Sequence, residues 1–302
     1  MIMPTPHGDK LKALLQNEKL PNSDRTRIDK ALERYHDWIE ALRRLPTGNS
    51  GIAEAVRLLN DYRLFLDLDV VFDSEDDFLY RQKGQLKLDS TVIEEFLPHL
   101  VSLAFPDISE SFSIGPHSCF AALYFTSTIR TSIRSPGAQV RTKNQDFTIS
   151  KRLYLRASFH PDRAEKVDTL EANLGYLCAE CKTNLDKTMF QEACATAHDL
   201  KTAVPGAKYL LLCEWLDMTP ISTAGTDIDE VLILRKAKRL GAQIRSAFAT
   251  REGRISRRAD FAKHLADHPF ATEVFERFLT HIRVLLEDRD PDEDDVLVRG
   301  YF

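Results

Sequence analysis

The chain has 302 residues, of which 43% are hydrophobic and 29% charged, a balance typical of a soluble globular protein with one large or two small domains. Its longest apolar runs are no longer than a strand, so we expect no signal peptide, no membrane span and a cytoplasmic location. The formal net charge of −5 argues against a general affinity for nucleic acid, and contact with DNA has to come from local clusters of positive charge.

Residues 1–110 are predicted to form a helical region. Apolar side chains recur at helical spacing through residues 9–60, and separate helices are expected over 52–66 and 91–104. Two breaks divide the region, Leu-Pro-Asn-Ser-Asp and Leu-Pro-Thr-Gly-Asn-Ser-Gly. The side chains at these breaks that are suited to cap a helix are Asn22, Ser23, Asn49 and Ser50. Such a region would embrace a ligand or support dimerisation.

Residues 111–302 change character, and the alternation of strands with helices over about 120–240 predicts an α/β core. In chain order, we first expect a helix over 119–130, strands at 146–149 and 152–158 around a short polar turn, and a helix over 161–174. A strand over 176–182, a helix over 186–204 capped by Asp186 and a strand over 208–217 should follow. Residues 227–248 are expected to return to helix after a short strand. The pattern therefore indicates a sheet flanked by helices.

The sequence contains five cysteines, an odd number placed within apolar runs, which indicates reduced thiols in the cytoplasm. Cys178 and Cys181 form a C-x-x-C pair. Because residues three apart on a strand point to opposite faces, these two thiols are expected to be small core side chains rather than a metal or redox site.

Glu180 and Lys182 lie where the strand predicted over 176–182 leaves the core. On a strand both side chains face the same side, about 7 Å apart, while Cys181 faces away. A carboxylate there can help bind a hard divalent cation. The lysine can orient or help deprotonate an attacking water, or stabilise the charge of a phosphorane-like transition state. The alternative is an ordinary ion pair at a solvent-facing strand edge.

A metal needs a second carboxylate, and two candidates lie upstream of Glu180. Asp146 opens a predicted strand, from which its side chain would reach the end of a neighbouring strand. Asp168 would lie in the middle of a helix if 161–174 is helical, or opposite Glu180 if 173–175 is a hairpin turn. Asp146 is favoured, and the choice stays open.

Two stretches of the chain are strongly basic. Residues 235–258 contain nine Lys or Arg and one acid, and residues 130–143 contain four Lys or Arg and no acid. Either stretch can attract phosphate groups or can simply form a solvated surface. The residues expected to contact DNA are Arg130, Arg134, Arg141, Lys143, Arg254, Arg257 and Arg258. Arg134 and Arg141 come first, because their loop is expected to lead straight into Asp146.

The spacing of Asp146, Glu180 and Lys182 resembles the PD-(D/E)XK nucleases, with Gln145-Asp146 in place of the usual proline-aspartate. The longer stretch LEANLGYLCAECKTNLDKTMFQEA is similar to the central motif of type II restriction endonucleases of the BbvCI type. The resemblance implies a restriction-endonuclease-like α/β core, a mixed sheet flanked by helices. It also implies that Asp146 and Glu180 hold Mg²⁺ while Lys182 serves the nucleophilic water. Gln191 or Glu192 would contact the waters of the metal.

The resemblance further implies a double-stranded DNA substrate cut at a specific short sequence. Residues 1–110 would then embrace DNA or support dimerisation, and 111–302 would form the nuclease core with C-terminal helices. Cleavage of both strands calls for a homodimer or for a heterodimer with a related subunit. The competing interpretations are a catalytically inactive DNA-binding protein with the same fold and a repair nuclease.

Overall fold

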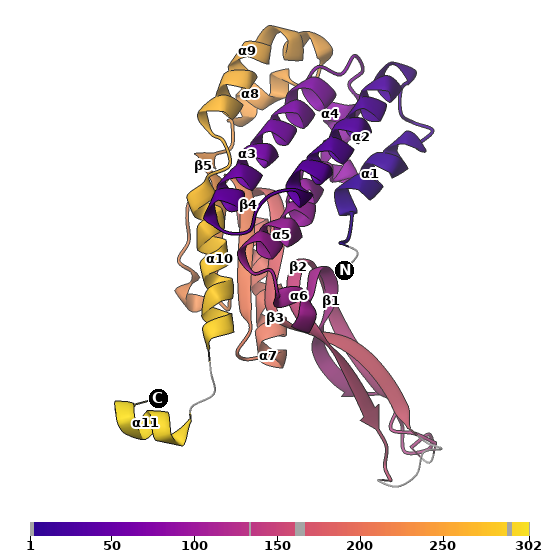
Figure 1. Cartoon of the computed structure of the whole chain (residues 1–302). Coiled ribbons are helices and arrows are strands. Elements are labelled where there is room, and N and C mark those ends of the chain that lie inside the picture. Colours follow the sequence, from indigo (N-terminus) through magenta and orange to yellow (C-terminus); the bar gives the residue numbers. More distant parts are fainter. Residues whose placement is uncertain (1–2, 133, 161–166, 289–291, 302) are drawn as a thin grey trace.

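A five-stranded mixed sheet forms the centre of the molecule, and helices cover both of its faces (Figure 1). The computed structural model describes residues 3–132, 134–160, 167–288 and 292–301. Within these ranges no helix is long and apolar enough to cross a membrane. The predicted fold class, a mixed sheet flanked by helices with a helical N-terminal region, is confirmed.

The N-terminal region is helical as far as Ser111. Its elements are α1 (Pro6–Leu15), α2 (Asn22–Arg43), α3 (Asn49–Phe65), the π-helical η1 (Leu66–Phe72), α4 (Phe78–Leu86), α5 (Ser90–Ala104) and α6 (Ile108–Ser111). The predicted capping by Asn22, Ser23, Asn49 and Ser50 is wrong, because Pro21 and Gly48 precede α2 and α3 and neither helix has a side-chain cap. Gly48 instead turns the chain with a φ of 91° and donates its N–H to the carbonyl of Leu103.

The sheet has the strand order β1–β2–β3–β4–β5. Its strands are β1 (Ser113–Phe125), β2 (Ala138–Ala157), β3 (Asp168–Leu185), β4 (Lys208–Leu216) and β5 (Glu230–Lys238). β1, β2 and β3 pair antiparallel in sequence order, whereas β3, β4 and β5 run parallel. The carboxyl ends of the three parallel strands therefore meet at one edge of the sheet, where ligands of α/β proteins commonly bind.

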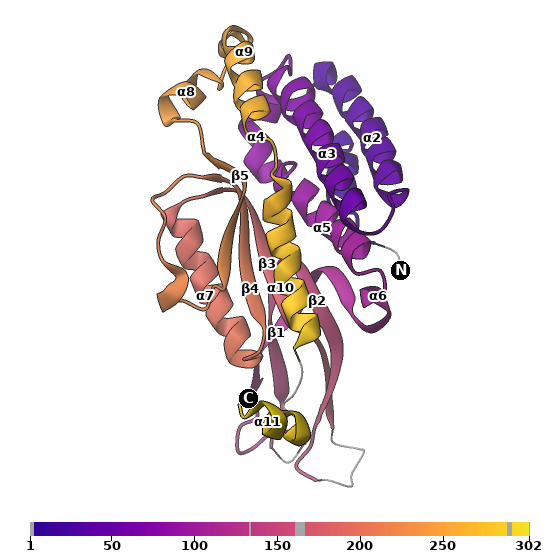
Figure 2. The same cartoon turned by 60° about the vertical axis from the view of Figure 1, so that its left-hand side comes forward.

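Residues of the central strand β4 alternate between two hydrophobic cores. Leu210 and Leu212 pack with α5 and with α10 (Thr272–Glu287), whereas Tyr209, Leu211 and Cys213 pack against α7 (Lys187–Ala203). Figure 2 shows α7 and α10 on either side of the strands. Because β4 is buried on both faces, its sequence is a continuous apolar run. The core on the α5 side continues without a break into the N-terminal helices.

The remaining elements follow β3, β4 or β5 in the chain. They are α7, the short 3₁₀ turn η3 (Thr223–Gly225), α8 (Ala242–Ala247), α9 (Arg251–Asp267), α10 and α11 (Glu293–Arg299). Asp186 caps α7 as predicted, accepting a hydrogen bond from the N–H of Met189 at 2.9 Å. In both views α8 and α9 lie at the same end of the molecule as α4 (Figures 1 and 2).

Four predicted elements are wrong because long-range pairing overrides the local pattern. Residues 119–125 belong to β1 rather than to a helix, and 146–157 lie within one strand without a polar turn. Residues 168–174 form the start of β3, and the first part of the predicted helix, 161–166, lies outside the described residues. Residues 230–238 form β5.

Two hairpins, β1–β2 and β2–β3, project away from the end that carries α4, α8 and α9 (Figures 1 and 2). β2 takes part in both hairpins, which lie side by side. The Asp168 carboxylate accepts a hydrogen bond from the Ala138 N–H at 2.8 Å, and the Asn173 side-chain amide donates to the Ser118 carbonyl at 3.2 Å. These contacts connect the outer parts of the hairpins to each other.

Candidate active site

Asp146 and Glu180 meet where the pairing of β2 with β3 ends. The last paired residues are Phe147 and Ala179, and one step further along the same antiparallel register Asp146 stands opposite Glu180. The Asp146 carboxylate accepts a hydrogen bond from the Cys181 N–H at 2.8 Å. This bond takes the place of the missing strand pairing and fixes the carboxylate beside Glu180.

Asp146 does not open a strand as predicted, because β2 begins eight residues earlier at Ala138. Its carboxylate is largely enclosed. Burial, only partly offset by the Cys181 N–H and the Lys182 charge, raises the pKa of Asp146 above its usual range. The negative charge of Glu180 acts in the same direction. The site therefore concentrates negative charge in a partly desolvated place.

Glu180 and Lys182 form an ion pair on the same face of β3. The Lys182 Nζ lies 3.1 Å from a Glu180 oxygen. Burial opposes the charged form of the lysine, but the charge and hydrogen bond of Glu180 outweigh it and the pKa of Lys182 is raised. The lysine is thus a fixed ammonium at neutral pH, a suitable group for stabilising negative charge and for orienting water.

Glu94 is a third carboxylate at this site that sequence reasoning did not find. It lies on α5 and is 8% exposed. Burial, followed by the negative charge of Asp146, raises the pKa of Glu94 to about 7. The neighbouring Glu95 serves a different purpose, because it accepts hydrogen bonds from the backbone N–H groups of His7 and Gly8. The sequence feature that could have pointed to Glu94 is the pair of adjacent acids, Glu94 and Glu95, in a largely apolar helix.

These residues border a cleft of about 760 Å³ at the carboxyl edge of the parallel strands. Asp146, Lys182 and Glu94 lie in its lining together with Asn184 at the end of β3 and Trp215 on β4. α4 and the residue after it line it as well, as do α8 and α9. Among the described residues, no three His, Cys, Asp or Glu side chains converge closely enough to enclose a metal ion on their own.

Asp168, the alternative second acid, does not reach this site. It begins β3, twelve residues before Glu180 on the same strand, which is about 40 Å at 3.3 Å per residue. Its carboxylate is used by the Ala138 N–H. The structure therefore brings Asp146, and not Asp168, to Glu180 and Lys182.

A family model described as Bpu10I restriction endonuclease matches residues 85–302. The chain belongs to the Bpu10I restriction endonuclease family. The match includes the strands that carry Asp146, Glu180 and Lys182, and it confirms the predicted resemblance to type II restriction endonucleases and the nuclease class. No curated protein matches the chain. The matching solved structures include one described as native BbvCI A2B2 tetramer at low resolution, with 18% identity, coverage of 88% of this chain and 98% of that chain, and a TM-score of 0.43.

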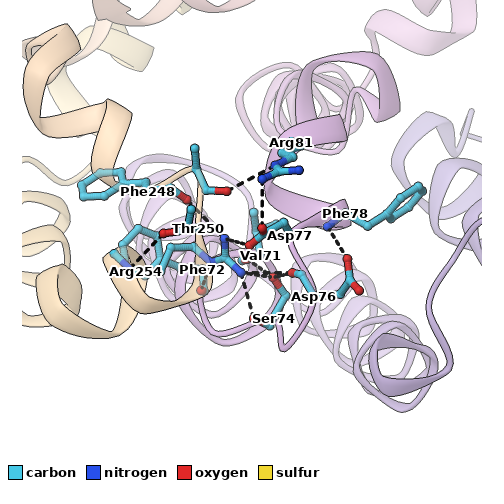
Figure 3. A network of polar contacts seen from close by, with 12 residues as sticks. Val71, Phe72, Ser74, Asp76, Asp77, Phe78, Arg81, Phe248, Thr250 and Arg254 are labelled. Atoms are coloured by element: carbon cyan, nitrogen blue, oxygen red, sulfur yellow. Dashed lines mark hydrogen bonds and ion pairs between the residues drawn. The ribbon is translucent and has the colours of Figure 1, made fainter.

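Arg254, predicted to contact DNA in this restriction endonuclease, is instead buried, with 1% of its surface exposed. Its guanidinium donates hydrogen bonds to the backbone carbonyls of Phe72, Ser74, Asp76 and Phe248 and pairs with the Asp77 carboxylate at 2.9 Å (Figure 3). No donor remains for a phosphate or a base. A run of charges in the sequence does not reveal which member is buried.

The other predicted DNA contacts are surface residues, and most of them are ion-paired. Arg141 and Lys143 on β2 both bind Asp199 of α7, at 2.9 and 3.0 Å. Arg257 pairs with Asp260, and Arg258 pairs with Asp73 and Asp69.

Arg130 and Arg134 are exposed in the segment that joins β1 to β2. This segment does not lead straight into Asp146, because residues 138–145 of β2 lie between them. Eight strand residues span about 26 Å. A contact between these arginines and DNA is therefore separated from the reacting phosphate by more than the length of one side chain.

Gln191 and Glu192 lie on the exposed side of α7. The negative charge of Glu192 contributes to raising the pKa of Lys182. No such effect is seen for Gln191, which is uncharged.

Proposed function

We propose that this chain is a Mg²⁺-dependent type II restriction endonuclease that hydrolyses phosphodiester bonds of double-stranded DNA at a specific short sequence. One observation carries the proposal: the Asp146 carboxylate is fixed by the Cys181 N–H next to the Glu180–Lys182 ion pair, in a cleft open to solvent. The family match supplies the reaction class.

The residues present fit a magnesium ion. Mg²⁺ is usually held by one or two carboxylates, substrate phosphate oxygens and water rather than by a complete protein cage. Asp146 and Glu180 supply two carboxylates. Burial, and to a lesser extent the charge of Glu180, raises the pKa of Asp146, and a bound cation would offset both effects. When bound by these two acids, Mg²⁺ would polarise the scissile phosphate and offset its developing charge.

Each protein group then has a defined task. The Cys181 N–H holds Asp146 in place, and Glu180 holds the ammonium of Lys182 at the edge of the cleft. Lys182 orients the water that attacks the phosphorus in line with the leaving 3′ oxygen and stabilises the added negative charge. Glu94 adds negative charge beside Asp146 once it has lost its proton.

We further propose that two such chains, or this chain and a related subunit, act together on a duplex. Each DNA strand needs its own set of acids and lysine, and the described part of the chain contains one set. The five cysteines occur as free thiols, which supports action in the reducing cytoplasm. The N-terminal helices would then embrace DNA or support dimerisation.

The proposal is tested by incubating the purified protein with phage DNA and Mg²⁺, alongside Lys182→Ala and a chelator control. We expect a discrete ladder of fragments from wild type, none from the variant, and none after chelation. Sequencing of the fragment ends should return one short motif. A repair nuclease would instead give ends without a common motif, and an inactive DNA-binding protein would shift the mobility of DNA without cutting it under any condition.

A further inference from the structure

The wall of the cleft formed by α4 carries two lysines that have no acidic partner. Lys83 and Lys87 both line the cleft that contains Asp146. Among the residues the structure describes, no carboxylate oxygen lies within ion-pair distance of either ammonium. The other cations of the cleft are paired: Arg81 with Asp77, and Arg239 and Arg245 with Asp217.

Lys87 adopts a backbone conformation that favours glycine. It follows α4 with φ 52° and ψ 29°, in the left-handed region. Helices commonly end in this conformation, but usually with Gly or Asn, since a side chain with a Cβ is strained there. The next residue, Leu88, is fully buried. The presence of a lysine at this strained position, directly before a buried residue, indicates that its side chain has a function.

That side chain lines the same cleft as Asp146 and Glu94. In agreement with this position, the positive charge of Lys87 lowers the pKa of both acids against the larger effect of burial. Lys87 can therefore meet a DNA strand that enters the cleft.

Lys83 is held in position by an aromatic cluster. Its Nζ lies 4.5 Å from the centre of the Tyr80 ring, and Tyr80 packs edge-on against Phe72 and Phe248. The buried guanidinium of Arg254 lies 5.7 Å from the same ring. The network drawn in Figure 3 thus fixes the start of α4 and, through Tyr80, the direction of Lys83.

Lys83 lies on α4 and Lys87 directly follows it, and both side chains line the same cleft. We propose that they bind neighbouring phosphates of the DNA strand that enters the cleft toward Asp146 and Glu180. Arg239 and Arg245 also line the cleft, but both are held by Asp217. This inference rests on the proposed function for the identity of the ligand.

The test measures duplex affinity against salt concentration without added metal. The variants are Lys83→Gln, Lys87→Gln and the double variant, and the control is Lys151→Gln, a lysine exposed on β2 outside the cleft. Each phosphate contact contributes about 0.9 to the slope of log affinity against log salt. We expect the slope to fall by about 0.9 for each single variant and by about 1.8 for the double variant, for any duplex sequence.

Lys87→Gly separates DNA binding from a structural role. Glycine relieves the left-handed strain, so the melting temperature should rise, while the salt slope should fall as for Lys87→Gln. Slopes equal to that of Lys151→Gln in all these variants would overturn the inference. Fragment formation by wild type tests the proposed function separately, because the salt slopes are measured without cleavage.

Discussion

Glu94 and Asp146 bring carboxylates into one cleft from a helix and a strand that are far apart in the chain. Burial and the charge of Asp146 raise the pKa of Glu94 to about 7. Since a raised carboxyl pKa keeps the proton on the group at higher pH, Glu94 is mostly neutral at pH 6 and mostly charged at pH 8. The negative charge available to a cation therefore increases across neutrality.

Glu94→Gln should change the response to Mg²⁺ in a pH-dependent way. At pH 8 we expect the half-saturating Mg²⁺ concentration to be about tenfold higher than for wild type, the effect of ~1.4 kcal/mol. At pH 6 wild-type Glu94 is protonated, and the two values should converge. Cleavage rates over a Mg²⁺ titration at both pH values provide the measurement. A ratio that stays constant with pH would show that Glu94 does not act through its charge.

Part of the site could be predicted from sequence because it depends on local geometry. Glu180 and Lys182 share a strand face by the two-residue period, and Asp186 caps the helix that follows. Glu94 could not be found in this way. Its place beside Asp146 depends on how α5 packs over β2, which no local pattern encodes.

Among the elements, β2 is the strand that positions Asp146, because it pairs with both β1 and β3. It pairs with β1 from Ala138 to Ser150, with a register shift around Asp146, and with β3 from Phe147 onward. Asp146 therefore lies one residue before the pairing with β3 begins, and its carboxylate accepts the Cys181 N–H. Asp168 connects the outer ends of the two hairpins instead. The two aspartates thus have separate tasks at different points of the same strand pair.

Alanine at each position should separate these tasks. Asp146→Ala should lower cleavage by at least about 100-fold, since substitutions of residues that only hydrogen-bond to metal ligands can already reduce activity by that factor. Asp168→Ala should keep cleavage near the wild-type rate and cost about 1.5 kcal/mol of unfolding free energy, the value of one hydrogen bond to a charged acceptor. Fragment yield and urea unfolding measure the two effects. Loss of cleavage in folded Asp168→Ala would contradict this assignment.

The elements confirmed from sequence are those whose partners are close in the chain. The second part of β3, α7 and β4 follow one another as a strand, a crossover helix and a parallel strand, and their apolar patterns are sufficient to predict them. β1 and β2 were missed or divided because their polar residues pair across hairpins, where hydrogen bonding replaces hydrophobic patterning as the signal.

For the whole molecule, Arg254 connects parts of the chain that are about 180 residues apart. It lies on α9 and satisfies the carbonyls of the segment between η1 and α4. Arg258 and Asp73 extend this junction at the surface, at 2.7 Å. The junction ties the segment before α4 to α9, and it thereby connects the N-terminal wall of the cleft to the C-terminal one.

Arg254→Met should therefore destabilise the fold rather than remove a DNA contact. Removing one partner of a buried charged network costs about 3–5 kcal/mol, whereas Arg257→Gln on the exposed side of α9 should change stability by less than about 0.5 kcal/mol. Chemical unfolding of both variants provides the comparison. A wild-type unfolding curve for Arg254→Met, combined with weaker DNA binding, would restore the original prediction for this residue.

The burial of Arg254 could not be predicted, because most of its hydrogen-bond partners lie in a distant, N-terminal part of the sequence. Composition marks residues 235–258 as basic, but the structure shows surface residues, several of them ion-paired, around two buried guanidiniums, those of Arg235 and Arg254. Lys83 and Lys87, the described lysines of the cleft that have no acidic partner, lie in a stretch without a conspicuous charge cluster.

Helix α10 completes the core with Phe275, Phe278 and Leu279, and the Phe278 ring lies 5.4 Å from that of Phe147, the neighbour of Asp146. The ribosome makes this helix after every strand of the sheet. Until it has emerged, Phe147 lacks the Phe278 ring that packs against it next to Asp146. Nuclease activity should therefore arise only after α10 has been made and has packed against the sheet, so a growing polypeptide without this helix does not expose the host chromosome to cleavage.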